Sequence, residues 1–283
     1  KDLLFPRDAA DPVTPNGAIQ WSNIDGDVVN KGFEISLNGD VLKKKDLTWN
    51  LGVNASFLNN TLKNFVGEIP TGEVNGQGLS GAFAQLIKTG YALNSFYLKK
   101  FIGIDKTTGI SLYQDGEAKF FMGSANPKVL LGVSTSVNYQ KFSLDLNFNG
   151  AFGHYLYNNT ANGVTSFNNI GKRNIGLSEY NIAKSLGEKP VNPTSASSRY
   201  LEKGDYLKLN NATLSYAVGN LGKNIRNANV FVTGQNLFVI TKFTGFDPEV
   251  NVAKPMNGVP SFGMENTPYP SARTFTVGIN FTL

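Results

Sequence analysis

The chain has 283 residues, with 26 Lys and Arg against 21 Asp and Glu, one His and no Cys. The lack of cysteine excludes disulfides, thiolate metal sites and cysteine nucleophiles. The basic residues are scattered apart from one run of three lysines at 43–45. We therefore interpret the net charge of +5 as a solvated surface and not as a nucleic-acid footprint.

Composition also bounds the fold class. No apolar run reaches the roughly 20 residues of a transmembrane helix, and the opening residues KDLLFPRDAADP lack the apolar stretch of a signal peptide. A high aromatic content with abundant Gly and Asn favours strands and turns over helices. We expect an all-β protein that is either mature or a piece of a longer chain.

Alternation of apolar and polar residues predicts nine strands. A period of two is typical of a strand whose faces meet different surroundings. In chain order the strands are predicted at 33–41, 47–57, 91–104, 109–113, 129–139, 142–148, 206–218, 229–240 and 274–283. The strand at 91–104 is less regular and that at 109–113 is the weakest. Asn210 and Asn211 interrupt the strand at 206–218, where a β-bulge would fit.

The strands are long, and their connections alternate between short and long. Many run about 10 to 14 residues, against about 5 to 6 in globular proteins, and a tilted bilayer crossing needs about 9 to 11. Short connections are predicted at 43–46, 105–108, 140–141 and 219–228, and long ones at 58–90, 114–127, 156–204 and 241–272. Short periplasmic turns and longer extracellular loops are typical of outer-membrane barrels.

The fold class predicted is therefore an antiparallel transmembrane β-barrel portion of eight or nine strands. Bacterial single-chain barrels have an even strand count. Nine strands that begin on the outer side would leave an open edge, which a bilayer does not tolerate. The sequence thus predicts that residues 1–283 are the C-terminal part of a larger barrel.

Several ordered blocks resemble the SusC/RagA family of TonB-linked outer-membrane proteins. The segment NKGFEISLNGDVLKKKDLTWNLGVNASFLNN at 30–60 resembles a strand, short turn and return strand of that family. Further blocks are FIGIDKTTGISLYQDGE at 101–117, NPKVLLGVSTSVNYQKFSLDLNFNGAFGHYLYN at 126–158, RYLEKGDYLKLNNATLSYAV at 199–218, NVFVTGQNLFVITKFTGFDPEVN at 229–251 and the ending YPSARTFTVGINFTL. The resemblance implies part of a TonB-dependent transporter of about 22 strands, with the plug domain and TonB box outside this chain.

The resemblance also implies a function and partners. Such proteins import large nutrients, either oligosaccharides or peptides, across the bacterial outer membrane. A SusD-like surface lipoprotein closes over the barrel, and the TonB-ExbB-ExbD complex supplies energy through the N-terminal part. We expect the loops at 156–204 and 241–272 to contact the lipoprotein and capture ligand, and outer-membrane lipids to surround the wall.

The two strand faces supply the candidate site residues. The apolar face is expected to meet lipid through Phe33, Leu37, Leu144, Leu146, Phe275 and Ile279. The polar face is expected to line the lumen, with Glu34, Asn147, Asn149 and Gln235 as ligand-facing candidates. Tyr155, an aromatic residue near a strand end, fits either an interfacial girdle or ligand stacking and is the fifth candidate.

Two other motifs are not predicted to form a catalytic or nucleotide-binding site. His154 is the only histidine and lacks orienting partners in sequence, so we expect no catalytic residues and no enzyme. GQGLSG at 76–81 has no βαβ context and is interpreted as a loop before a short amphipathic helix at 79–87.

Carboxylates recur in pairs at 25/27, 115/117 and 247/249. Asp beside Gly is common in turns, so we interpret these carboxylates as turn residues. Oxygen-rich loops also suit calcium, so a loop-bound calcium stays open, and no other cofactor is expected.

The sequence alone leaves two alternative functions open. A soluble or surface β-sandwich that binds glycans would show the same alternation and would be extracted without detergent. A barrel protease or lipase would need an acid, a base and a nucleophile that converge near the outer rim, which a single histidine disfavours.

Overall fold

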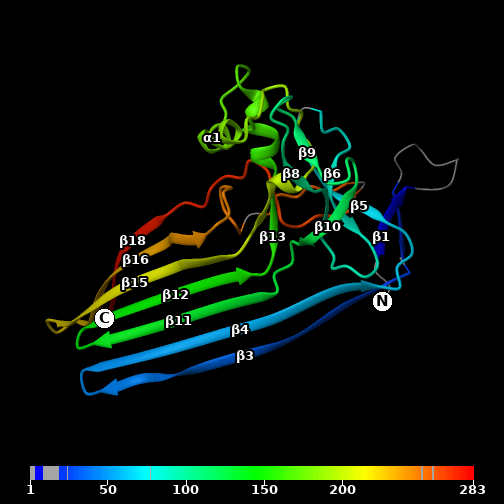
Figure 1. Ribbon diagram of the computed structural model, residues 1–283. Helices are drawn as coiled ribbons and strands as arrows, with labels where there is room; N and C mark the ends of the chain where they lie inside the picture. The colour runs from blue at the N-terminus through cyan, green and yellow to red at the C-terminus, as the bar shows by residue number, and fades with distance from the viewer. Residues whose placement is uncertain (1–3, 9–18, 24, 77, 250, 257) are drawn as a thin grey trace.

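The computed structural model describes residues 4–8, 19–23, 25–76, 78–249, 251–256 and 258–283. Long antiparallel strands form one sheet, which we name the wall, and the long connections between them fold together at one end of it (Figure 1). We name these connections, the described residues of 64–128, 153–205 and 242–273, the cap. A separate two-stranded sheet of β1 (Leu4–Asp8) and β2 (Ile19–Asn23) precedes the wall.

The wall contains seven strands in the order β18-β16-β15-β12-β11-β4-β3. Their bounds are β3 (Asp27–Lys44), β4 (Leu47–Lys63), β11 (Val129–Tyr139), β12 (Phe142–Phe152), β15 (Tyr206–Leu221), β16 (Ile225–Thr241) and β18 (Thr274–Thr282). Each corresponds to a strand predicted from alternation. The predicted bulge is also confirmed, because Asn147 pairs with Asn211 while Phe148 pairs with Leu209, which leaves Asn210 as the extra residue.

The other two predicted strands lie in the cap instead of the wall. The segment 91–104 divides into β7 (Ser95–Lys99) and β8 (Phe101–Ile104), and 109–113 contributes β9 (Ser111–Tyr113), which pairs with β8. Asn94 adopts φ +59°, which ends any extended run from Tyr91. The predicted loops 58–90 and 114–127 are therefore parts of one excursion between β4 and β11, and the turn at 105–108 lies inside the cap.

Two small sheets and one helix build the rest of the cap. The first sheet has the order β10-β7-β6-β5, with β5 (Ile69–Glu73), β6 (Phe83–Ile87) and β10 (Lys119–Ser124). The second contains β13 (Tyr155–Asn158), β14 (Leu201–Lys203) and β17 (Met264–Glu265). The helical elements are α1 (Leu177–Leu186) and the short turns η1 (Thr160–Val164), η2 (Phe167–Asn169) and η3 (Ser198–Tyr200).

The amphipathic helix predicted at 79–87 is wrong, because β6 occupies most of that range. The four residues Ala84 to Ile87 are all buried, so both faces of this strand are covered. A short strand buried on both faces shows no alternation, and its apolar spacing is easily read as helical. Among the described residues, no helix is long and apolar enough to cross a membrane.

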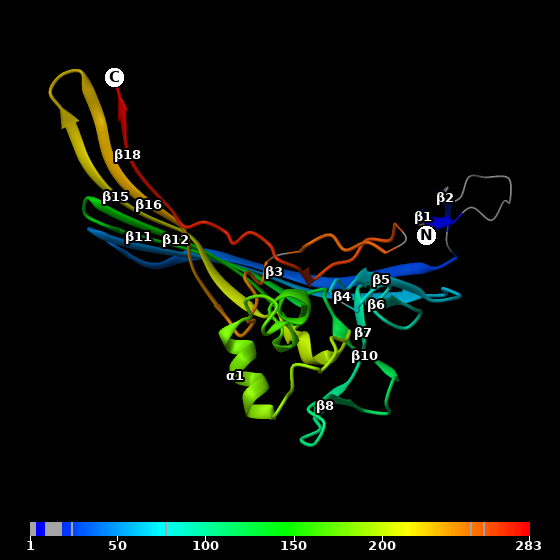
Figure 2. The ribbon, with the colours of Figure 1, turned by 90° about the horizontal axis from the view of Figure 1, so that it is seen from above.

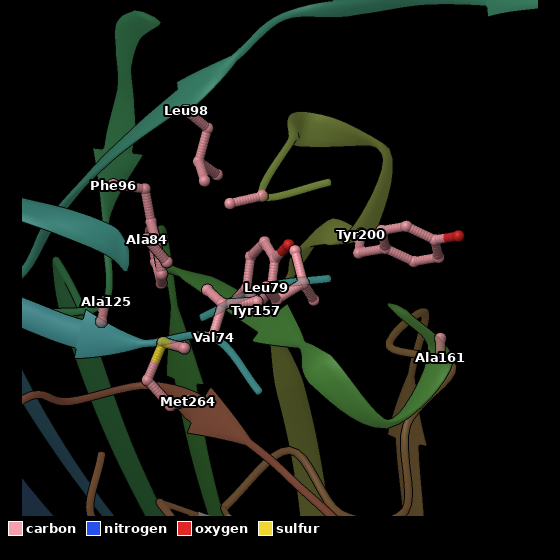
Figure 3. Close-up of a cluster of buried hydrophobic side chains, with 11 residues drawn as sticks. Val74, Leu79, Ala84, Phe96, Leu98, Ala125, Tyr157, Ala161, Tyr200 and Met264 are labelled. Carbon is pink, nitrogen blue, oxygen red and sulfur yellow. The ribbon is translucent and has the colours of Figure 1, made fainter. Parts of the chain in front are cut away.

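The cap has its own hydrophobic core, to which all three connections contribute (Figure 3). Phe96 and Tyr157 are fully buried at its centre, with ring centroids 6.5 Å apart, and Met264 joins them from the third connection. A second cluster packs Leu62 of β4 against Phe65, Ile87 and Val259, and so joins the cap to the wall. The long connections are thus a packed body and not free loops.

We expect Phe96→Ala to loosen the cap and leave the wall intact, since truncation of a fully buried Phe costs about 3 to 5 kcal/mol. Hydrogen exchange should rise across the cap strands and stay unchanged in β11 and β12. Tyr269→Ala is the control, because that side chain is 94% exposed. Equal effects of the two substitutions would contradict the packed-cap description.

Candidate functional site

The register of the wall places its polar residues on one face. Residues directly opposite one another in an antiparallel pair project to the same face. One such row crosses all seven strands through Asn38, Gly52, Ser134, Asn147, Asn211, Gln235 and Thr274. The next row towards the short turns contains Asp40, Asn50, Ser136, Asp145, Thr213, Thr233 and Thr276.

The opposite face is apolar and uncovered. Phe33, Leu37, Phe275 and Ile279 are each 59 to 70% exposed, and Leu144 is also exposed. Leu146 lies on the same face and is half-buried. Monomeric soluble proteins rarely expose a contiguous apolar area of this kind. The strands run side by side and curve together, so the apolar face extends over the whole wall (Figure 2).

The structure brings three of the five candidate ligand residues together on the polar face. Asn147 and Gln235 lie in one row through Asn211, and Asn149 lies in the neighbouring row. Asn147 and Gln235 are exposed, whereas Asn149 is half-buried. The predicted and observed faces of these three residues agree because strand side chains alternate, so the register fixes the face of every residue.

Glu34 lies on the same face but at the far edge of the wall, in β3. The hydroxyl of Ser56 donates a hydrogen bond of 3.2 Å to its Oε1. Glu34 also lines a cavity of about 830 Å³ between the ends of β3 and β4 and the cap segments around Leu93 and Asn126. The side chains of Asn30, Asn60, Asn94 and Asn126 place amide groups around this cavity.

Tyr155 lies away from the wall, in β13 of the cap. It is half-buried against the cap core, and a Cβ on Gly123 would lie 2.6 Å from its Cδ2. Gly123 itself has φ +101°, so the strand beside the ring needs glycine for both conformation and space. Tyr155 therefore packs within the cap and does not share a surface with Asn147 or Gln235.

A carboxylate from the cap binds the polar face beside these residues. Glu249, in the connection after β16, accepts hydrogen bonds from Nδ2 of Asn149 at 2.7 Å and from the hydroxyl of Tyr206 at 3.1 Å. Its other oxygen pairs with the ammonium group of Lys208, which is only 5% exposed. Asn149 therefore holds the cap on the wall in addition to lying on the polar face.

Electrostatics favour this contact. Burial alone would raise the pKa of Glu249, but hydrogen bonds from Lys208, Asn149 and Tyr206, with the Lys208 charge, hold that pKa below its usual range. The sequence pattern predicts a turn role for Glu249 and does not identify Lys208 as its partner. A lysine within an alternating strand, on the polar phase, was the only available signal.

Two of the other paired carboxylates also have protein partners. Asp247 accepts the backbone N–H of Glu249 at 2.9 Å and the hydroxyl of Ser271 at 2.9 Å. Glu117 pairs with Lys99 at 3.2 Å. Within the described part of the chain, no group of three or more His, Asp or Glu is arranged to hold a metal. A loop-bound calcium stays a prediction.

His154 lies at the junction of wall and cap and is 4% exposed. Its Nδ1 is 4.0 Å from Oδ1 of Asp205, which also accepts the N–H of Gly153 at 2.6 Å. Burial lowers the pKa of His154, while the charge of Asp205 acts in the opposite direction. A Cβ on Gly204 would lie 2.5 Å from Nε2, so the imidazole is packed closely between the two chain segments.

Substitution of Glu249 by Gln should release the third connection from the wall. The change leaves the buried Lys208 charge without its partner, which costs about 3 kcal/mol or more. Hydrogen exchange of the segment 243–249 should accelerate by about 100-fold. Glu68→Gln is the matched control, because its pair with Lys88 is exposed to solvent and contributes little to stability. Unchanged exchange in the Glu249 variant would contradict the assigned contact.

Sequence comparison shows which known proteins this chain resembles. No family model matches the chain. The TonB-dependent receptor P3 of Formosa agariphila is 28% identical over 315 residues, which cover 99% of this chain and 31% of that protein. The TonB-dependent receptor SusC of Bacteroides thetaiotaomicron is 26% identical over 294 residues, which cover 95% of this chain and 28% of that protein. The chain thus spans roughly 30% of the length of these curated relatives.

Solved structures agree on the fold. The RagAB peptide transporter matches 94% of this chain and 30% of its own, with a TM-score of 0.75 and 21% identity. The open-open state of the RagAB peptide importer matches 100% of this chain and 31% of its own, with a TM-score of 0.72 and 22% identity. The resemblance found in the sequence blocks is confirmed: the chain is similar over nearly its whole length to TonB-dependent receptors that include SusC, and it shares its fold with part of the RagAB structures.

Proposed function

We propose that the protein containing this chain imports large polar nutrients across the bacterial outer membrane as a TonB-dependent receptor. One observation carries the proposal: a wall of seven long strands has one polar and one exposed apolar face, as a lipid-embedded pore requires. The similarity of the chain to TonB-dependent receptors, and its shared fold with a peptide transporter, support the same function.

The apolar face separates this function from the glycan-binding sandwich. A soluble sandwich buries its apolar strand faces against a second sheet. In the described residues, the other sheets lie in the cap or before β3, and Leu37, Phe275 and Ile279 stay exposed. Lipid is the solvent that such a face fits, and this supports a location in the outer membrane.

The polar face suits passage of a hydrated solute. Its rows carry mainly Asn, Ser, Thr and Gln, with Asp40 and Asp145 among them. Neutral amides and hydroxyls form hydrogen bonds with sugar hydroxyls and with peptide groups, and bind neither very strongly. We therefore propose oligosaccharides or peptides as substrates, which bind and pass without bond chemistry.

Partners act at opposite ends of the wall. A SusD-like lipoprotein would contact the cap, where Leu177 and Val191 are 75% and 72% exposed. Energy from TonB would reach the barrel through a plug domain and TonB box carried by sequence outside this chain. The packed cap gives the lipoprotein a defined surface to close against.

Uptake by intact cells tests the proposal. Deletion of the whole gene should abolish depletion of one fluorescently labelled oligosaccharide or peptide pool from the medium. A protonophore should have the same effect on the wild type, because import depends on the proton-motive force. Unchanged depletion of all pools, or recovery of the protein in the detergent-free soluble fraction, would contradict the proposal.

Adjacent substitutions test the two faces. Leu146 and Asn147 lie at the middle of β12 and project to opposite faces. Leu146→Arg should prevent assembly, since a charge on the lipid face near mid-bilayer costs about 2 to 4 kcal/mol, whereas Asn147→Arg should be tolerated. Heat-modifiable migration on gels and the amount of protein in the outer membrane measure assembly. Equal tolerance of both substitutions would contradict a lipid-exposed wall.

A further inference from the structure

The three short turns of the wall gather most of the net charge of the chain at one edge. They join β3 to β4, β11 to β12 and β15 to β16, and all lie at the end away from the cap (Figure 1). We name residues 43–46, 140–141 and 222–226 the turn rim. Its basic residues, all exposed, are Lys43, Lys44, Lys45, Lys141, Lys223 and Arg226.

Acidic residues do not balance this charge. Asp46 lies within the rim, and Asp40 and Asp145 lie together in the neighbouring row, so six basic residues against three acidic ones leave this edge with three of the five net positive charges of the chain. Within the described part of the chain, Lys43 is the rim cation that forms an ion pair, at 3.7 Å from Asp40, and both side chains are exposed. An exposed pair of this kind neutralises little. The rim therefore presents a positive field to whatever lies beside it.

Two of the lysines lie on the lipid side of the rim. Lys44 pairs with Leu47 at the end of the hairpin, in line with Tyr139 and Phe142 on the apolar face. The ammonium group of Lys141 lies 6.0 Å from the ring centroid of Tyr216 on the same face. The rings of Tyr216 and Phe142 pack with centroids 4.9 Å apart.

Along the apolar face towards the turns, aromatic rings come first and lysines follow them. The same order is expected across a membrane interface. Aromatic rings such as Tyr139, Phe142 and Tyr216 concentrate at the level of lipid headgroups. Lysines just beyond them then lie at the level of the phosphates, and each basic residue near an anionic lipid surface strengthens binding roughly fivefold.

We propose that the turn rim binds the phosphate groups of anionic phospholipids in the adjoining leaflet, with Lys44 and Lys141 as the principal contacts. The site rests on the proposed outer-membrane function and extends it to a specific lipid class. It selects anionic over zwitterionic headgroups, because an uncompensated row of cations meets the net negative charge of the former.

Lipid selection by the whole protein tests the site. The purified protein is placed in nanodiscs of phosphatidylcholine with a minor fraction of phosphatidylglycerol, and the retained lipids are counted by native mass spectrometry. Wild-type protein should retain phosphatidylglycerol above its share of the bilayer. The Lys44→Gln/Lys141→Gln variant should lose this enrichment at least about fivefold, and Lys44→Arg/Lys141→Arg should keep it.

A matched pair in the cap supplies the control. Lys172→Gln/Arg173→Gln removes two exposed charges far from the rim and should leave enrichment unchanged. Full enrichment in the Lys44/Lys141 glutamine variant, or equal loss in the cap variant, would overturn the lipid site. Wild-type protein that enters nanodiscs without enrichment would also overturn the site alone. Failure of the wild type to enter nanodiscs would overturn the proposed function together with the site.

Discussion

The structure depends on one constraint: the two faces of a single antiparallel sheet meet different surroundings. Because strand side chains alternate with a period of two, one register decides the environment of every wall residue. Rows such as Asn38–Asn147–Gln235 keep polar groups together across the sheet, while Leu37 and Phe275 remain exposed on the other side. A slip of one residue in any strand would place a polar row in lipid. The bulge at Asn210 shows how the wall absorbs an extra residue and keeps this phase.

The cap depends on the same wall for its position. Three connections that are separate in sequence share the core around Phe96, Tyr157 and Met264. This core is fixed to the sheet at two places, through Leu62 at the end of β4 and through Glu249 on Lys208. The charged contact lies on the polar face of the wall, where Asn149 and Tyr206 also donate hydrogen bonds to Glu249. The three long connections are thereby held at one end of the wall and not left to sample many positions.

Alternation predicted the seven wall strands, the bulge and the polar face shared by Asn147, Asn149 and Gln235. It could not predict the cap, because strands such as β6 and β7 are short and buried on both faces, which removes the period. For the same reason the apolar spacing at 79–87 resembles that of a helix. Lys208 and Glu249 meet only through tertiary packing, 41 residues apart in sequence. The basic residues looked scattered because only the sheet topology brings the three turns to one edge.

The most direct measurement of the central claim is the solvent accessibility of β11, residue by residue. This chain has no native cysteine. Once any cysteines in the rest of the whole protein are replaced, single cysteines introduced from 130 to 138 can be spin-labelled in the protein reconstituted in bilayers. Collision with oxygen reports lipid, and collision with a water-soluble nickel chelate reports the aqueous pore. The account predicts oxygen maxima at 131, 133, 135 and 137 and nickel maxima at 132, 134 and 136, with a strict period of two. Uniform accessibility along β11, or maxima in the opposite phase, would contradict it.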